Sequence, residues 1–167
     1  MLGKMVKTIY AANNEQATYY MKQHQGESIK NISDGTIARY GSVGRNKMIS
    51  NKAREKSLKN GFSPQEHSTA AANVVILYEY SHMIIERPDR KGNADVTIRY
   101  YETSIEFSPS GKRGWAQIMM KMSNIEGNTL YTIELIGIKN KSDLIDEPLS
   151  EEAIRASDPI IKLPSEP

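Results

Sequence analysis

The chain has 167 residues, of which 38% are hydrophobic and 25% charged, and its formal net charge is +2. These values are typical of one globular domain and exclude a chain that is disordered throughout or fibrous. The absence of cysteine excludes disulfides, thiolate metal sites and cysteine catalysis. No apolar run is long enough to span a membrane, and the first ten residues lack the apolar core of a signal peptide. We therefore expect a cytoplasmic protein without a membrane partner.

The first part of the chain predicts helices on either side of one hairpin. Residues 13–25 are typical of a short helix with an asparagine as its N-cap. The pair Asp34-Gly35 lies between two short β-like runs and predicts a hairpin turn, because both residues tolerate positive φ. Residues 49–60 predict a basic helix with Ser50 as its cap.

A second capping signal is followed by a change of period. Ser63 and Glu66 frame a Ser-Pro-Gln-Glu capping box, which predicts a helix from residue 64 to about 80. Beyond it the apolar residues alternate, as is typical of strands. Four runs predict strands: residues 83–85, 94–107, 115–122 and 129–138. The alternation shifts at Tyr100-Tyr101, which predicts a bulge or bend in the longest strand.

These elements predict an α+β fold in which N-terminal helices and a β-hairpin precede a four-stranded antiparallel sheet. The domain is expected over residues 1–139. Residues 140–167 are expected to form an acidic, proline-containing tail, with seven acidic and three basic residues. The alternatives for this tail are a disordered end and a segment that folds back over a basic surface of the domain.

Positive charge is concentrated in residues 39–60, which carry seven Lys or Arg and a single acidic residue, Glu55. A cluster of this sign favours a polyanion such as nucleic acid. The alternative is a solvated helix face, because Lys and Arg are mostly exposed in any protein.

Several stretches of the chain carry a resemblance to a known family. The stretch NNEQATYYMKQHQGESIKNISDGTIARYGSVGRNK contains a helix, then QG-x-S-I-x-N-x-x-x-G, then a basic loop. Together with KSLKNGFSPQEHSTAAANV, WAQIMMKM and LYTIEL, it resembles the large polyvalent-protein-associated domains of phage and mobile-element proteins. Those domains are grouped with the barnase–EndoU–colicin–RelE superfamily of small nucleases.

The resemblance implies a fold and an activity. The expected fold is that of a ribonuclease that needs no metal or other cofactor, with the substrate on the open face of the sheet. The expected role is that of a toxin or effector that cleaves RNA in the cytoplasm, or after delivery into a host cell. RNA and a protein inhibitor are the partners that such a role implies.

Metal-independent RNA cleavage requires a base for the 2′-hydroxyl, an acid for the leaving oxygen and cations for the phosphate. His67 is the candidate acid or base, because histidine changes charge near neutral pH. The alternative is that His67 simply decorates the start of its helix and has no functional role. Arg45 and Lys47 are the candidate phosphate ligands, since a glycine-flanked loop lets the backbone approach a phosphate closely. No metal site is expected, because the three histidines are far apart.

Five further residues are candidates for binding nucleic acid. Lys52 and Arg54 lie on the predicted basic helix, and Lys121 and Thr132 lie on neighbouring predicted strands. Tyr131 is a candidate for stacking on a base. Its alternative is a place in the core, where aromatic residues of strands usually pack.

The predicted strands offer several carboxylates and no obvious choice among them. Glu102, Glu106 and Glu134 all lie in these strands, and nothing in the sequence selects one as a base. Tyr101 is a second candidate for stacking on a base, with the same structural alternative as Tyr131.

Three functions remain open at this point. The first is a ribonuclease, for which chelator-resistant cleavage of RNA is expected. The second is a non-catalytic nucleic-acid-binding module on the same fold, for which salt-sensitive binding without cleavage is expected. The third is a protein-interaction domain that uses the acidic tail as a docking segment. For this function, neither binding nor cleavage of RNA is expected.

Overall fold

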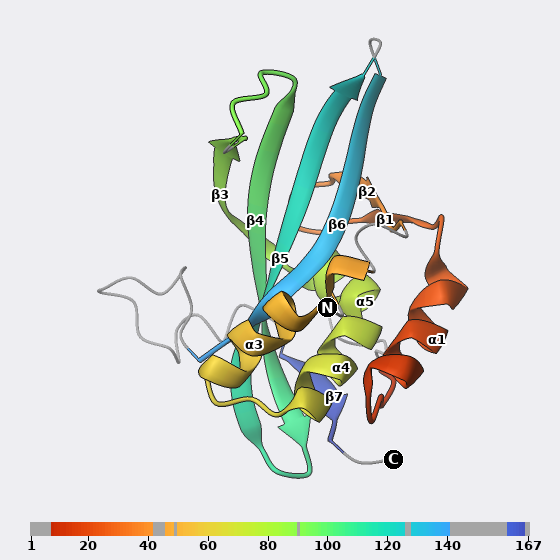
Figure 1. Cartoon of the computed structure of the whole chain (residues 1–167), viewed down its shortest axis with the longest axis vertical. Coiled ribbons are helices and arrows are strands. Elements are labelled where there is room, and N and C mark those ends of the chain that lie inside the picture. The colour runs from red at the N-terminus through yellow and green to blue at the C-terminus, as the bar shows by residue number, and fades with distance from the viewer. Residues whose placement is uncertain are drawn as a thin grey trace.

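The structure, a computed structural model, describes residues 8–41, 46–48, 50–89, 91–125, 128–140 and 160–165. A long, twisted sheet forms the body of the molecule, and the helices gather around its lower half (Figure 1). The predicted α+β class is confirmed, because helices and strands pack together into one core.

Two helices have their predicted positions and caps. The helix α1 spans Asn14–His24, and the side chain of Asn13 caps its first turn. The helix α3 spans Asn51–Lys59, and Ser50 caps it in the same way. Such caps satisfy backbone N–H groups that have no partner within the helix.

The helix expected to reach residue 80 is divided into two. The first part, α4, spans Pro64–Ala72 and begins with the predicted capping box at Ser63. The second part, α5, spans Val74–Tyr80 and begins after a break at Asn73. The side chain of Asn73 donates to the carbonyl of Ile9 at 2.7 Å and accepts from its N–H at 2.8 Å. The break is therefore tied to a contact with the N-terminal segment, which helical spacing alone does not reveal.

One mixed sheet runs through the described residues in the order β1-β2-β6-β5-β4-β3, with β7 paired to β4. The strands are β1 Ser28–Lys30, β2 Ile37–Arg39, β3 His82–Pro88, β4 Val96–Ser108, β5 Lys112–Ile125, β6 Asn128–Lys139 and β7 Ile161–Pro164. Strands β3 to β6 pair as consecutive antiparallel neighbours, as expected from the sequence.

The expectation of a four-stranded, wholly antiparallel sheet is wrong. The sheet has seven strands, and two of its pairings are parallel. The β1–β2 hairpin joins the sheet where Arg39 pairs with Thr132, and β7 joins it where Ile161 pairs with Ile105. Both pairings connect segments that are far apart in the sequence, so the alternation within one segment could not predict them.

Strand β7 comes from the tail that was expected to lie outside the domain. Its residues Ile161 and Leu163 are buried in the main core cluster. The segment Ile161–Pro164 is therefore part of the fold. Residues 141–159, and with them the predicted fold-back over a basic surface, lie outside the described residues.

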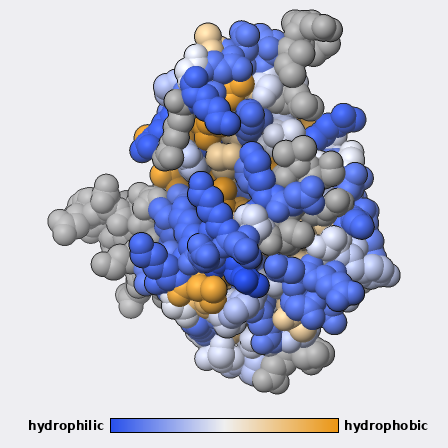
Figure 2. Space-filling view, in the orientation of Figure 1, coloured by the Kyte–Doolittle hydropathy of each residue, from blue (hydrophilic) through white to orange (hydrophobic). Residues whose placement is uncertain are grey.

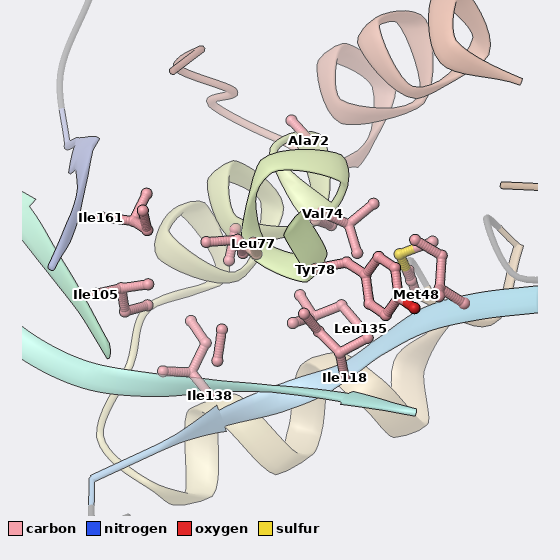
Figure 3. Packing of buried hydrophobic residues seen from close by; sticks show 14 of the residues in the cluster. Met48, Ala72, Val74, Leu77, Tyr78, Ile105, Ile118, Leu135, Ile138 and Ile161 are labelled. Carbon is pink, nitrogen blue, oxygen red and sulfur yellow. The ribbon is translucent and has the colours of Figure 1, made fainter. Parts of the chain in front are cut away.

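The hydrophobic core lies between one face of the sheet and the helices α4 and α5. Leu77 and Tyr78 of α5 pack toward Ile105, Ile118 and Leu135, which come from β4, β5 and β6 (Figure 3). Successive side chains of a strand point to opposite faces of the sheet. The residues between these core positions therefore lie on the opposite face, away from α4 and α5.

A β-bulge shapes the edge strand β3. Its pairing with β4 shifts between Met83 and Ile85, at the level of Tyr100 and Tyr101. The sequence predicted an irregularity at this level but assigned it to the longer strand. The extra residue is Ile84, in β3. A bulge bends its strand and re-aims the side chains beside it.

Candidate functional site

A cavity of about 820 Å³ opens on the sheet face that α4 and α5 leave uncovered. Its floor is formed by β4, β5 and β6. One wall comes from α3 and the turn before it, and the other from β3 and the loop that leads into β4. In the space-filling view, apolar side chains over the strands lie among hydrophilic ones above α3 (Figure 2).

Positive charge dominates this cavity, which we call the basic cavity. It is lined by seven cationic side chains: Lys47, Lys52, Lys56, Arg87, Lys91, Lys121 and Lys139. Asp89 and Glu134 are the carboxylates that line it. The formal excess of five positive charges is larger than the +2 of the whole chain, so the rest of the protein is net negative. A concave surface of one sign focuses the field and concentrates anions.

Part of the floor of the basic cavity is apolar, although Gln117, Lys121 and Glu134 also lie on it. Ile98 and Tyr100 of β4 lie on it, and Tyr100 pairs across the sheet with Met119 of β5. The consecutive residues Ile84 and Ile85 both line the cavity beside them. In a regular strand they would point to opposite faces, and the bulge at this position accounts for the difference. A cavity that combines cations with an apolar floor fits a ligand that carries both anionic and flat apolar groups.

Glu134 of β6 is a largely buried carboxylate within this positive surface. Its side chain is 11% exposed, and its Oε1 lies 3.8 Å from Nζ of Lys47. Desolvation by burial raises the pKa of Glu134 above its ordinary value, although the charges of Lys47 and Lys121 act in the opposite direction. The sequence did not distinguish Glu134 from the other strand carboxylates, because burial and the lysine neighbours arise only in the folded sheet.

Three of the predicted site residues come together in the basic cavity. Lys47 comes from the turn before α3, Lys52 from α3 and Lys121 from β5, and all three line the cavity. Lys47 was predicted as a phosphate ligand, and the other two as residues that bind nucleic acid. Arg45, the other predicted phosphate ligand, lies outside the described residues.

Three other residues predicted to bind nucleic acid are not among those that line the cavity. Arg54 donates from Nη2 to Asn51 of its own helix at 3.4 Å. Thr132 pairs with Lys121 across β5 and β6. Tyr131 is partly buried and packs against the hydrophobic core, which is the structural alternative for this residue.

The aromatic residue in the cavity is not one of the two tyrosines predicted to stack on bases. Tyr101 is fully buried in the core, whereas its neighbour Tyr100 lines the floor of the cavity. Alternation along β4 puts one tyrosine of this pair on each face. The sequence signal was therefore present, but nothing in the sequence shows which face is open.

His67 lies inside the protein rather than in the cavity. Its ring is fully buried, with Nδ1 2.7 Å from Ser57 Oγ and Nε2 2.8 Å from the carbonyl of Met48. Ser57 Oγ also accepts the N–H of Ile138, so His67 connects α3, α4 and β6. Desolvation lowers the pKa of His67, although its bond to Met48 acts in the opposite direction. This buried position also differs from the expected alternative, in which His67 only decorates the start of its helix.

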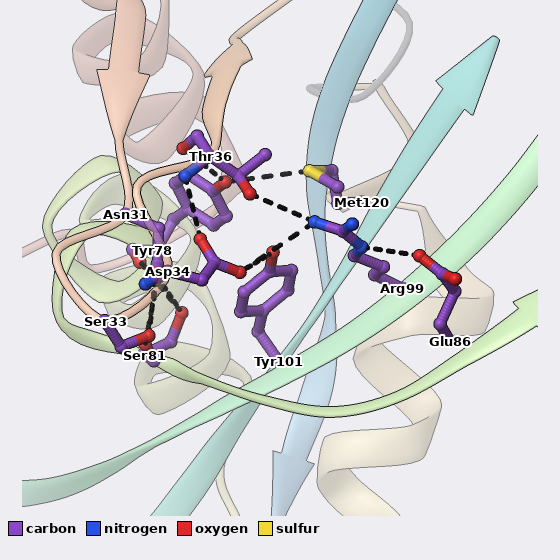
Figure 4. A network of polar contacts seen from close by, with 10 residues as sticks. All are labelled: Asn31, Ser33, Asp34, Thr36, Tyr78, Ser81, Glu86, Arg99, Tyr101 and Met120. Atoms are coloured by element: carbon purple, nitrogen blue, oxygen red, sulfur yellow. Dashed lines mark hydrogen bonds and ion pairs between the residues drawn. The ribbon is translucent and has the colours of Figure 1, made fainter.

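A polar network fixes the β1–β2 hairpin on the sheet face opposite the cavity (Figure 4). The hydroxyl of Tyr101 donates to Asp34 at 2.6 Å, and Nη1 of Arg99 lies 3.9 Å from the same carboxylate oxygen. Arg99 also donates to Thr36 at 3.0 Å and to Glu86 at 2.8 Å. Desolvation opposes the charged form of Asp34, but hydrogen bonds from Tyr101 and Thr36, together with the charge of Arg99, hold its pKa below the ordinary value.

Asn31 anchors the other end of this hairpin turn. It is fully buried and donates to the carbonyls of Tyr78 and Ser81 at 2.7 and 2.9 Å. Its side-chain oxygen accepts from the N–H of Asp34 at 3.0 Å. The asparagine and glycine of the motif QG-x-S-I-x-N-x-x-x-G therefore build a turn that docks on α5 and β4. The asparagine side chain accepts from the N–H of Asp34, and the backbone N–H of Gly35 bonds to the carbonyl of Asn31, so the motif needs these two residues four positions apart.

The part of the chain that the structure describes contains neither a candidate metal site nor a candidate membrane-spanning helix. No group of three or more His, Cys, Asp or Glu side chains that could hold a metal ion occurs among these residues. Within the same ranges, no helix has both the length and the apolar character needed to cross a membrane.

Comparison of the chain with known proteins gives a match to one family model. No match to the chain was found among curated proteins or among solved structures. A family model described as "Large polyvalent protein-associated domain 3" matches residues 7–131, which covers most of the chain. The match includes α1 to α5 and the strands β1 to β5, and it ends within β6 before Glu134. The chain therefore belongs to the large polyvalent protein-associated domain 3 family, a membership that associates it with phages and mobile elements.

Proposed function

We propose that this protein binds nucleic acid, and RNA in particular, in the basic cavity. The observation that carries the proposal is the lining of the cavity, with seven cationic side chains against two carboxylates over a partly apolar floor. Phosphate groups supply the negative charge that such a surface attracts, and their counterions are released on binding.

The placement of the cations supports the proposal further. Lys47 and Lys52 stand on one wall, Arg87 and Lys91 on the other, and Lys121 rises from the floor between them. A strand of nucleic acid that enters the cavity therefore meets cations on both sides. Arginine can also grip a phosphate with two N–H groups, which lysine cannot.

The test is a titration of fluorescently labelled RNA, followed by anisotropy at several salt concentrations. Lys52→Gln with Lys121→Gln removes two charges from the cavity. The matched control, Lys22→Gln with Lys30→Gln, removes two charges from α1 and β1, where both lysines are exposed. We expect only the cavity variant to bind more weakly, with a salt slope that falls by about one for each lysine that no longer binds a phosphate. Equal effects of the two variants, or no binding at low salt, would contradict the proposal.

A second candidate function is metal-independent cleavage of RNA, and the position of Glu134 favours it. Attack by the 2′-hydroxyl needs a base, and burial raises the pKa of Glu134 toward the range in which a carboxylate accepts a proton effectively. The charges of Lys47 and Lys121, which act on the same carboxylate, would stabilise charge on the phosphate. The leaving 5′-oxygen would take a proton from solvent, and Glu134 would release to solvent the proton that it accepted. Glu134 thus replaces His67 as the proposed base.

Cleavage is tested with labelled RNA incubated in EDTA beside Glu134→Gln, with fragments resolved on a gel. Fragments from the parent protein alone would support the ribonuclease. Intact RNA with a shifted band in both lanes would leave the binding function alone. If the RNA is cleaved, the predicted protein inhibitor would be a partner with an acidic surface that competes with RNA for the basic cavity.

A further inference from the structure

We infer that the nucleic acid in the basic cavity is single-stranded, with its bases on the apolar floor and its phosphates along the lysine-rich walls. This inference rests on the proposed function, because it specifies the form of nucleic acid that the same cavity accepts. It is carried by the floor of the cavity, which the charge argument alone does not explain.

The floor presents an apolar strip to the ligand, beside the polar side chains of β5 and β6. Tyr100 of β4 and Met119 of β5 are direct cross-strand neighbours and lie side by side on it. Aromatic side chains stack on bases of any sequence, because every base has a π-face. Ile98 lies two residues from Tyr100 on the same face of β4 and extends this surface.

The bulge in β3 adds to the same surface. Without it, Ile84 and Ile85 would point to opposite faces of the sheet, and one of them would be absent from the cavity. With it, both isoleucines line the cavity beside the floor strands. The bulge thus directs two consecutive apolar side chains of an edge strand toward a cavity lined by lysines. This arrangement is consistent with a ligand that has apolar as well as charged groups.

A nucleic-acid duplex does not expose the groups that would contact the apolar side chains of the floor. Its bases are stacked on one another, and the surface that it offers consists of phosphates, sugars and base edges. The base faces that would contact Tyr100 and Met119 are hidden inside the helix. The cavity volume of about 820 Å³ is also within the range of sites that enclose a single small ligand, roughly 300–1,000 Å³, so it suits a short piece of one strand.

The experiment is a competition for labelled single-stranded RNA bound to the full chain. The competitors are the same strand unlabelled, a duplex that contains it, and inorganic polyphosphate, which has charge but no bases. We expect the single strand to compete best at equal phosphate concentration. Equal competition by duplex and polyphosphate would overturn the inference and leave the proposed function standing. No binding of any of these polyanions would remove both.

Variants of the floor give a second, independent measurement. Tyr100→Ala is expected to weaken binding of the single strand by about 5-fold to 150-fold, the range for one base–aromatic stack. Tyr100→Phe keeps the ring and is expected to bind as the parent protein does. Tyr19→Ala is the matched control, because Tyr19 is exposed on α1, away from the cavity. If Tyr100→Ala binds like Tyr19→Ala while Met119→Ala is also without effect, the inference is wrong.

Discussion

The carboxylate of Glu134 lies 3.8 Å from the ammonium group of Lys47, inside a cavity that has a formal excess of positive charge. The two groups differ in exposure, because the Lys47 side chain is 56% exposed and that of Glu134 is 11% exposed. The Lys47 side chain can therefore reorient toward a ligand in solvent, whereas burial restricts the side chain of Glu134. When a phosphate binds to Lys47, Glu134 loses part of the positive charge that favours its ionised form.

This relationship predicts that binding is coupled to uptake of a proton by Glu134. Burial already raises the pKa of this carboxylate, and an anion bound nearby raises it further. The complex therefore holds more protons than the free protein, and affinity rises as the pH is lowered from neutral toward the raised pKa of Glu134. Anisotropy titrations over this range, at constant ionic strength, measure the effect.

The variant Glu134→Gln shows whether this carboxylate is responsible. It cannot ionise, so we expect it to bind more tightly than the parent protein near pH 8 and to lose most of the pH dependence. Glu15→Gln, an equal change of charge at an exposed position of α1, serves as the control. A pH profile that is the same for the parent and for Glu134→Gln would disprove the coupling.

A second prediction concerns His67 and the stability of the fold. The unfolded chain has the ordinary histidine pKa of 6.5, whereas burial lowers the pKa of His67 in the folded protein. Below pH 6.5 the unfolded state therefore binds more protons, and the free energy of unfolding decreases as the pH falls. Urea unfolding between about pH 7.5 and about pH 5 follows this loss.

Replacement of His67 tests the same assignment directly. His67→Ala leaves Ser57 Oγ and the carbonyl of Met48 without their partner and opens a cavity, so we expect a loss of about 2–5 kcal/mol. His24→Ala, at a partly exposed position at the end of α1, removes only a surface contact with Glu27 and is expected to change the stability by less than about 1 kcal/mol. Equal stability of His67→Ala and the parent protein would contradict the structural role.

A third prediction concerns the hydrogen bond between Tyr101 and Asp34. Tyr101→Phe removes the donor, and Asp34→Ala leaves the buried hydroxyl of Tyr101 without its acceptor. Each change is expected to lower the stability by about 1–3 kcal/mol. The double variant should lose less than the sum of the two, because the shared bond can be removed only once. Strictly additive losses in urea unfolding would show that the two residues do not interact.

The sequence predicted the local elements of this fold well. The caps at Asn13, Ser50 and Ser63 stand where capping residues were expected, and the antiparallel run from β3 to β6 follows the alternating segments. Caps and alternating strands depend on residues that are close in the sequence, so each can be predicted from a single segment. The parallel pairings of β2 with β6 and of β7 with β4 depend on distant segments and were missed.

The candidate site could be predicted only in part, for the same physical reason. Lys47, Lys52 and Lys121 were selected because positive charge is visible in the sequence. Glu134 and Tyr100 were missed, because their roles depend on which face of the sheet is open. His67 was selected for its chemistry, but burial decides how a histidine behaves, and the sequence does not show it.

The last prediction concerns strand β7, which returns from the predicted tail to the sheet. Leu163 is fully buried in the core and lies on the strand that pairs with β4. Leu163→Ala is expected to lower the free energy of unfolding by about 2–5 kcal/mol, as for other leucines in a packed core. Lys162→Ala changes the neighbouring residue, whose side chain is exposed, and should cost less than about 0.5 kcal/mol. Urea unfolding of both variants decides whether the strand belongs to the cooperative fold. If Leu163→Ala unfolds at the same urea concentration as Lys162→Ala, β7 is an attachment that contributes nothing to stability.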